Sequence, residues 1–271
     1  MKYANHMVKS LNKSIFHRKG LEHITVIILF MMFLNIEANA QIVNIENQRL
    51  RKLKDGWSGN VDLSFSITNN TKTIYQVGNR NKIYWKRDRH LVTGITDFNF
   101  VGVDNQNYVN NGFQHIRYAY NSCEFPMFYL EGFEQMQYNQ IQLIQFRTLL
   151  GGGVRAIVLD RDSASINLGA FLMGEYEEEA KGKINRQIRY STFISFDFQF
   201  NKTTGINSIT YIQPDVISPD DIRVSSETSL RFNITQKLKF KLVYSLQYDS
   251  FPPEGAPKTM YFISNVFGFE F

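Results

Sequence analysis

The sequence predicts an all-β fold, an antiparallel transmembrane β-barrel of about 12 strands (range 10–14) that follows a cleavable signal peptide. Three observations predict it: long runs in which apolar and polar residues alternate, a closing segment of alternating aromatic residues, and a basic, then apolar, leader. The alternating runs exceed the length of ordinary globular strands and match that of tilted membrane strands. We therefore expect one apolar face toward lipid and one polar face inside.

The first 40 residues have the features of a secretory signal peptide. Five basic residues precede an apolar run over residues 24–34, which is shorter than the roughly 20 residues that span a bilayer. Ala38 and Ala40 supply a small-x-small cleavage pattern. We expect residues 1–40 to be removed and the protein to be exported to the outer membrane of a Gram-negative bacterium.

Composition excludes several other classes of protein. The leader holds five basic and two acidic residues, so only about +2 of the net charge of +5 belongs to the remainder. The sequence contains no stripe of basic residues, so nothing in it predicts a nucleic-acid partner. Cys123 is the single cysteine, so the chain cannot form an intrachain disulfide.

Residues 41–55 do not alternate cleanly, and we expect them to be a periplasmic lead-in before a barrel over residues 56–271. The predicted strands begin near residues 56, 72, 90, 112, 126, 140, 164, 186, 206, 221, 238 and 258. Short turns are predicted at residues 87–89, 160–162, 201–205 and 235–237, and longer loops at residues 104–108, 177–185, 214–221 and 250–257. Short turns at one end and longer loops at the other are typical of outer-membrane barrels.

Two segments call for special explanations. The run over residues 140–157 changes parity, and we expect a bulge at Gly151, Gly152 and Gly153 to reset its register. The closing segment carries Phe267, Phe269 and Phe271 on one face, and we expect it to be the signal read by the barrel-assembly machinery.

The same alternation selects residues that would line the lumen: His115, Arg117, Glu131, Gln135, Arg147, Arg155, Glu175, Arg223, Glu227 and Arg231. They allow two interpretations. A charged lumen could select a small solute, or the same groups could form an internal network of salt bridges that fills a narrow barrel, because buried charge must be paired.

Catalytic and metal-binding motifs are not found in the sequence. No Gly-x-Ser-x-Gly elbow, His-x-x-His or Cys-x-x-Cys occurs, and Gly151–Gly153 is not followed by the Lys-Ser/Thr of a phosphate loop. We therefore expect no catalytic residues, metal or cofactor. Two alternatives remain: a barrel enzyme acting on lipid or peptide through His115, and a soluble secreted β-barrel that binds a small ligand. Phe196, Phe198 and Phe200 on one face argue against the second.

An ordered set of motifs also carries a family resemblance. The set consists of Val43-Asn44-Ile45-Glu46, Gly56-Trp57-Ser58-Gly59, His115-Ile116-Arg117-Tyr118, Glu131-Gly132-Phe133, the Leu149 to Arg155 glycine run, Glu175-Tyr176-Glu177-Glu178, Gln213-Pro214-Asp215 and Pro252-Pro253. Together they resemble the salt-stress-induced outer-membrane protein family (YdiY-like), an uncharacterised-domain family, in its Bacteroidetes form. The resemblance implies an outer-membrane barrel without an established activity.

From these observations we expect a non-enzymatic, porin-like outer-membrane protein, either a narrow channel or a structural envelope protein. Its expected partners are outer-membrane lipid, the barrel-assembly machinery and small solutes, and nucleic acid is not among them.

Overall fold

The structure is a computed structural model that describes residues 53–69, 72–104, 106–235 and 238–269. Every described residue lies in one compact unit of the chain. The expected leader with Ala38 and Ala40, most of the lead-in, and Phe271 lie outside the described residues. In the described ranges we find no helix with the length and apolar character needed to cross a membrane.

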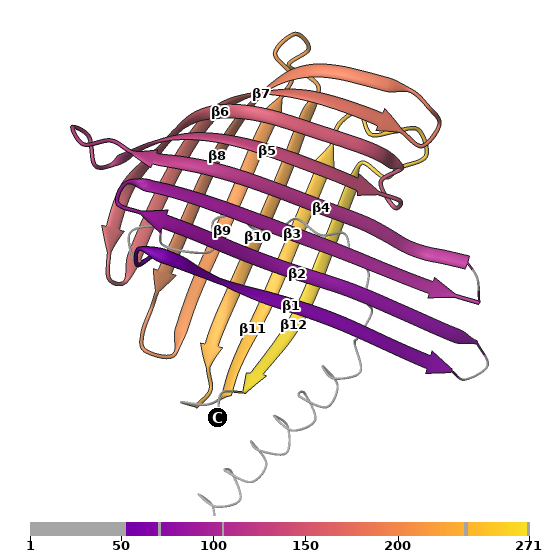
Figure 1. Cartoon of the computed structure of the whole chain (residues 1–271), viewed down its shortest axis with the longest axis horizontal. Coiled ribbons are helices and arrows are strands. Elements are labelled where there is room, and N and C mark those ends of the chain that lie inside the picture. The colour runs from indigo at the N-terminus through magenta and orange to yellow at the C-terminus, as the bar shows by residue number, and fades with distance from the viewer. Residues whose placement is uncertain (1–52, 70–71, 105, 236–237, 270–271) are drawn as a thin grey trace, which may run out of the picture. The chain divides into compact units, whose positions relative to one another are not determined.

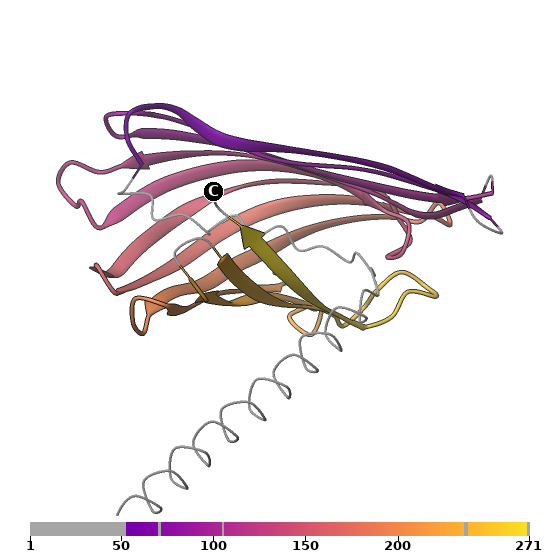
Figure 2. The same ribbon diagram turned by 90° about the horizontal axis from the view of Figure 1, so that it is seen from below.

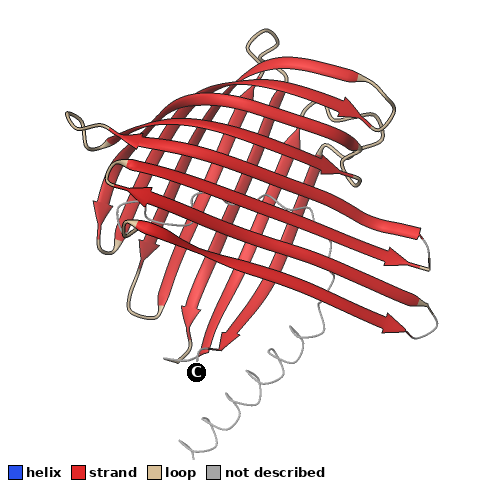
Figure 3. Cartoon of the chain, viewed as in Figure 1, coloured by secondary structure: helices blue, strands red, loops and turns tan. Residues whose placement is uncertain are grey.

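The described residues form one antiparallel sheet in which each strand pairs with the next along the chain (Figures 1 and 3). This confirms the predicted all-β, 12-stranded antiparallel fold. The strands are β1 (Gly56–Asn69), β2 (Thr73–Arg87), β3 (His90–Val103), β4 (Gln106–Asn121), β5 (Phe128–Asn139), β6 (Ile144–Arg161), β7 (Ala164–Glu179), β8 (Ile184–Gln199), β9 (Thr204–Pro214), β10 (Ile222–Asn233), β11 (Leu238–Asp249) and β12 (Thr259–Phe269).

The alternation in sequence becomes two different faces of this sheet. On β8 the side chains of Ile188, Tyr190 and Ile194 are exposed, whereas those of Arg189 and Phe193 between them are buried. Successive residues of a strand point to opposite faces, so a period of two separates the sets completely. The sheet curves around the face that holds the buried set (Figure 2), and we call this the interior face.

Ten of the twelve strands begin within two residues of the predicted positions. The expected loop at residues 104–108 is wrong, because β4 begins at Gln106 and its polar first residues pair with β3. The expected loop at residues 177–185 is also too long, since Glu177 pairs with Asn185 inside the ladder. β4 and β6 are the two strands whose starts differ from the prediction by more than two residues. β6 begins at Ile144, after a turn in which Asn139 Oδ1 accepts hydrogen bonds from the backbone N–H groups of residues 141 and 142.

The predicted bulge at the glycine run is wrong. Pairing with both neighbours is continuous through Gly151, Gly152 and Gly153. The register shifts lie elsewhere, at Gln137/Asn139, Ile144/Phe146 and Ile157/Leu159. The parity change in the sequence therefore arises at the ends of β6, and the glycines have another role, described below.

The links between strands fall at two ends of the sheet. The turn end holds residues 88–89, 122–127, 162–163, 200–203 and 234–235, and the loop end holds residues 72, 104, 140–143, 180–183, 215–221 and 250–258. The longest links, residues 215–221 and 250–258, are at the loop end, as predicted. Residues 122–127 are a longer link at the turn end than the sequence indicates.

The first and last strands are the edges of the sheet. Among the described residues no pairing joins β1 to β12. Every residue of β1 is exposed. The main-chain groups along these edges are thus available for a further pairing.

Candidate functional site

The interior face buries charge while the opposite face exposes apolar side chains. Arg155 and Arg189 are 2% and 0% exposed, whereas Leu150 and Leu172 on the outer face are 70% and 50% exposed. A water-soluble protein shows the reverse distribution. The arrangement therefore assigns polar chemistry to the interior and an apolar environment to the outside.

One carboxylate holds two guanidiniums toward the turn end of the interior. Glu131 on β5 lies between Arg117 on β4 and Arg155 on β6. Its carboxylate oxygens are 2.8 Å from Arg155 Nε and 3.3 Å from Arg117 Nη1. All three side chains are buried. We call these three residues the ion triad. The single carboxylate balances one of the two guanidinium charges, so the triad has a net charge of +1.

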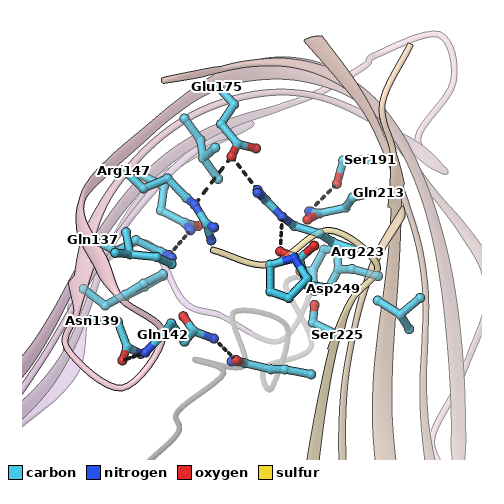
Figure 4. Close-up of a pocket in the computed structure, with 18 of the residues that line it drawn as sticks. Gln137, Asn139, Gln142, Arg147, Glu175, Ser191, Gln213, Arg223, Ser225 and Asp249 are labelled. Atoms are coloured by element: carbon cyan, nitrogen blue, oxygen red, sulfur yellow. Dashed lines mark hydrogen bonds and ion pairs between the residues drawn. The ribbon is translucent and has the colours of Figure 1, made fainter. Parts of the chain in front are cut away.

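A larger ion cluster lies nearer the loop end (Figure 4). Glu175 on β7 contacts Arg147 on β6 and Arg189 on β8, at 3.5 and 3.1 Å, and it also accepts a bond from Arg223. Because Arg223 belongs to β10, it reaches past β8 and β9 to make that contact. The cluster therefore ties strands that are not neighbours in the sheet.

Three further carboxylates complete the ion cluster. Glu177 pairs with Arg147 and with Arg223, Asp249 lies 2.8 Å from Arg223 Nε, and Asp221 lies 2.9 Å from Arg189 Nη2. The cluster thus has three guanidiniums and four carboxylates, and the ion triad has two and one. Together the two groups have no net charge.

A row of aromatic rings crosses the interior between the triad and the cluster. His115 stacks on Phe133, and contacts continue through Phe171 and Phe193 to Tyr211, with successive ring centroids 5.5, 6.0, 5.9 and 5.3 Å apart. The row spans β4 to β9, and β6 has no ring in it. Its edge-to-face and offset contacts are the geometries that aromatic pairs prefer.

The glycines of β6 and β7 make room for this row. A Cβ on Gly151 would lie 2.7 Å from Phe133, and one on Gly153 would lie 2.7 Å from Phe171. A Cβ on Gly169 would lie 2.1 Å from Phe193. The missing side chains of Gly151 and Gly153 therefore leave space on the interior face for the rings of Phe133 and Phe171.

A cavity of about 190 Å³ opens among these groups. The aromatic row forms part of its lining, and Arg147, Glu175, Arg223 and Asp249 contribute charge. Amide and hydroxyl side chains also line it, among them Gln137, Asn139, Gln142, Ser191, Gln213 and Ser225, which Figure 4 labels, and Gln135 and Gln247. Apolar side chains such as Leu149 and Met173 and the charged Asp97, Arg117 and Lys258 complete the lining.

The link at residues 250–258 borders the cavity at the loop end. Pro252 and Pro253 belong to the lining, and Pro253 is buried. Glu254 of this link lies 3.0 Å from Lys181 in the β7–β8 link. That hydrogen bond and the charge of Lys181 lower the pKa of the Glu254 carboxyl. An ion pair between two exposed side chains thus connects the β11–β12 link to the β7–β8 link.

The structure places all ten predicted lumen residues on the interior face. Six line the cavity: His115, Arg117, Gln135, Arg147, Glu175 and Arg223. Glu131 and Arg155 lie in the ion triad, and Arg231 pairs with Asp197 at 2.8 Å, farther toward the turn end. Glu227 is buried near the middle of β10.

The sequence interpretation missed several members of the site. Phe171 and Tyr211 of the aromatic row were missed because they read as ordinary apolar residues. Asp221 and Asp249 stand at strand ends, where alternation gives little guidance. Arg189 and Ser191 are two residues apart on one strand and so point to the same face, and this alternation was the available signal that Arg189 points inward.

Two further observations bear on chemistry. His115 Nδ1 lies 3.3 Å from Gln135 Oε1, and the described residues provide no hydrogen-bond partner for its Nε2. Within the described ranges, no group of three or more His, Cys, Asp or Glu side chains is arranged to hold a metal ion.

Comparison with known proteins gives one family. A family model described as "Protein of unknown function, DUF481" matches residues 61–271. No curated protein matches the chain. A solved structure titled "NanC porin structure in rhombohedral crystal form" matches 77% of this chain and 100% of its own, with a TM-score of 0.44 and 7% sequence identity. The family match covers the strands from within β1 onward.

Proposed function

Given that the chain belongs to the DUF481 family of proteins of unknown function, we propose that it is an outer-membrane β-barrel protein that serves as a narrow channel for small solutes. The proposal includes export through a leader cleaved after Ala40, assembly by the barrel-assembly machinery and contact with outer-membrane lipid. Within the family, the ordered sequence motifs support the salt-stress-induced, YdiY-like form of the Bacteroidetes type.

The observation that carries the proposal is the distribution of apolar and charged side chains on the two faces of the sheet. Outward residues of successive strands are apolar and at least 43% exposed, among them Ile116, Leu130, Leu150, Leu172, Ile188, Ile194, Ile212 and Ile263. In water such a continuous band would be an association surface. Against lipid it is the apolar belt of a transmembrane barrel.

The interior supports a narrow channel. Side chains of the ion triad, the aromatic row and the ion cluster occupy the interior face, and the cavity of about 190 Å³ lies among them. A wide aqueous channel needs more strands than twelve-strand sheets of this kind provide, since porins with open channels have about 16–18. Passage is therefore limited to solutes of the size of that cavity.

We also propose that the protein has no enzymatic activity. A barrel hydrolase would need His115 beside a nucleophile or an orienting carboxylate. The described hydrogen-bond partner of His115 is Gln135, and the imidazole ring of His115 stacks on the rings of Phe113 and Phe133. These neighbours support a binding role.

Planar-bilayer conductance of the refolded protein tests the channel. We expect discrete, small conductance steps in a preparation that also shows heat-modifiable gel mobility and β-rich circular dichroism. A folded preparation without conductance would contradict the channel and favour a structural envelope protein. Recovery of the native protein in a soluble periplasmic fraction would contradict the membrane location.

A further inference from the structure

The cavity on the interior face has a chemistry that specifies a class of ligand. We propose that it binds a neutral, hydroxylated six-membered ring, a single monosaccharide unit. As a statement about what is transported, this inference rests on the proposed channel; as a statement about binding, it stands on the cavity alone.

The volume sets the size of the ligand. An engineered cavity of about 150 Å³ in another protein admits benzene, so a comparable space holds one six-membered ring. The present cavity is about 190 Å³. One ring with its substituents fits this volume.

One wall of the cavity is aromatic. Phe133, Phe171, Phe193 and Tyr211 all contribute to the lining, and their contacts with one another fix their orientation. An aromatic ring offers an apolar surface with a negative face. The C–H groups on one side of a pyranose are apolar and slightly positive, so they complement such a wall.

The amide and hydroxyl side chains of the lining offer paired donors and acceptors. Gln135 Nε2 donates to Gln137 Oε1 at 2.8 Å, and Gln213 Nε2 donates to Ser191 Oγ at 3.0 Å. Each amide has two donors and an acceptor with two lone pairs, so these bonds use part of its capacity. A sugar hydroxyl both donates and accepts, which is the pattern that amides complement.

The charges that line the cavity favour a neutral ligand. Arg147, Arg223, Glu175 and Asp249 each contact a group of opposite charge, as do Asp97 and Arg117, and the remaining charged residue of the lining, Lys258, is exposed at the loop end. An anion or a cation entering the cavity would have to separate one of these pairs or remain uncompensated, and both are costly in a buried site. A neutral ring can bind to the lining without disturbing them.

His115 supplies a polar atom that calls for a partner. Its ring is 1% exposed, lines the cavity, and has no described hydrogen-bond partner at Nε2. Buried polar atoms are nearly always hydrogen-bonded, so an exception requires an explanation. A ligand hydroxyl, which can serve the imidazole nitrogen in either tautomer, would satisfy it.

Three sugars of the same ring size test the proposal. Binding of D-glucose, D-glucosamine and D-glucuronate to the refolded protein in detergent micelles is measured by calorimetry and by saturation-transfer NMR. We expect D-glucose to bind saturably and at least threefold more tightly than either charged sugar. Equal or tighter binding of a charged sugar, or no saturable binding of any of the three, overturns the proposal.

A pair of glutamines provides matched variants. Gln213→Leu removes an amide that lines the cavity, whereas Gln199→Leu removes one at the turn end of β8, away from it. We expect Gln213→Leu to weaken D-glucose binding at least fivefold and Gln199→Leu to leave it unchanged, with both variants retaining heat-modifiable mobility. Equal effects of the two variants overturn the assignment of the cavity.

Conductance of the same preparation separates this inference from the proposed function. If the protein binds D-glucose but does not conduct, the binding site is supported and the proposed channel is contradicted. If the protein conducts but neither binds D-glucose nor is blocked by it, the channel is supported and the proposed binding site is contradicted.

Discussion

At the residue scale, Glu131 is the position whose charge matters most. Its carboxylate is the described acidic partner of both Arg117 and Arg155, and the three side chains are almost completely buried. Glu131→Gln would remove the carboxylate charge that these two buried guanidiniums contact, and breaking a buried ion pair in this way costs about 3–5 kcal/mol. We expect a loss of that order in the unfolding free energy, measured by urea titration in detergent or lipid.

Glu134→Gln on the same strand is the control, because Glu134 lies on the outer face and is only half-buried. We expect that variant to be as stable as the parent protein or more so. Similar destabilisation in both variants would mean that the ion triad has no special role.

Gly153 tests whether the glycine run exists to seat the aromatic row. A Cβ there would lie 2.2 Å from the backbone oxygen of Ala170 and 2.7 Å from the Phe171 ring. Gly153→Ala should therefore destabilise the fold by about 1–3 kcal/mol, the usual cost of overpacking. Gly152→Ala is the neighbouring control, since its Cβ would be 3.4 Å from the nearest atom. Equal thermal stability of the two variants would contradict this role.

The sequence was informative about inward charge and less so about inward aromatics. His115, Arg147 and Glu175 could be predicted because a charged residue among apolar neighbours has only one sensible face in a membrane strand. Phe171 could not, because an aromatic side chain is acceptable on either face, whereas Phe193 shares the parity of Arg189 and Ser191 on β8 and could be placed inward from it. The contacts of Arg223 with β7 depend on the curvature of the sheet, which no local pattern contains.

At the scale of elements, polar strand ends explain the errors in the predicted boundaries. The first residues of β4 are rich in Asn and Gln, so they read as a loop, although they pair with β3. The predicted starts of the ten strands other than β4 and β6 lie within two residues of those observed. Pairing with a neighbour thus extends a strand beyond its apolar pattern.

The edge strands provide a prediction at the same scale. We expect β1 and β12 to pair in the membrane, because a barrel leaves no exposed main-chain edge in lipid. In a Cys123→Ser background, Ser264→Cys is combined in turn with Asp62→Cys, Ser64→Cys and Ser66→Cys, all on the interior face. One of these pairs should form an intramolecular disulfide in membranes, detected by gel mobility with and without reductant.

Combinations of Ser264→Cys with Leu63→Cys or Phe65→Cys are the controls, since their side chains point to the opposite face. Closure predicts no disulfide in them. Disulfide-linked dimers in place of intramolecular bonds would show that the edges pair between copies of the chain.

At the scale of the whole molecule, the outer face can be tested with a single charge. Leu172 lies in the middle of β7 and is 50% exposed, whereas Ile217 in the 215–221 link is 85% exposed. Leu172→Arg should lower the unfolding free energy in lipid vesicles by about 2–4 kcal/mol, the cost of an arginine near the bilayer midplane. Ile217→Arg should have little effect. Tolerance of arginine at both positions would contradict insertion in a bilayer.

The balanced ion groups have an electrical consequence. Moving one elementary charge through a membrane potential of 100 mV involves about 2.3 kcal/mol, and voltage-gated proteins open by displacing several such charges. Here the five guanidiniums and five carboxylates of the ion triad and the ion cluster together carry no net charge, so a displacement of the whole group transfers none. We expect single-channel current to rise linearly with applied potential and the open state to persist at either polarity.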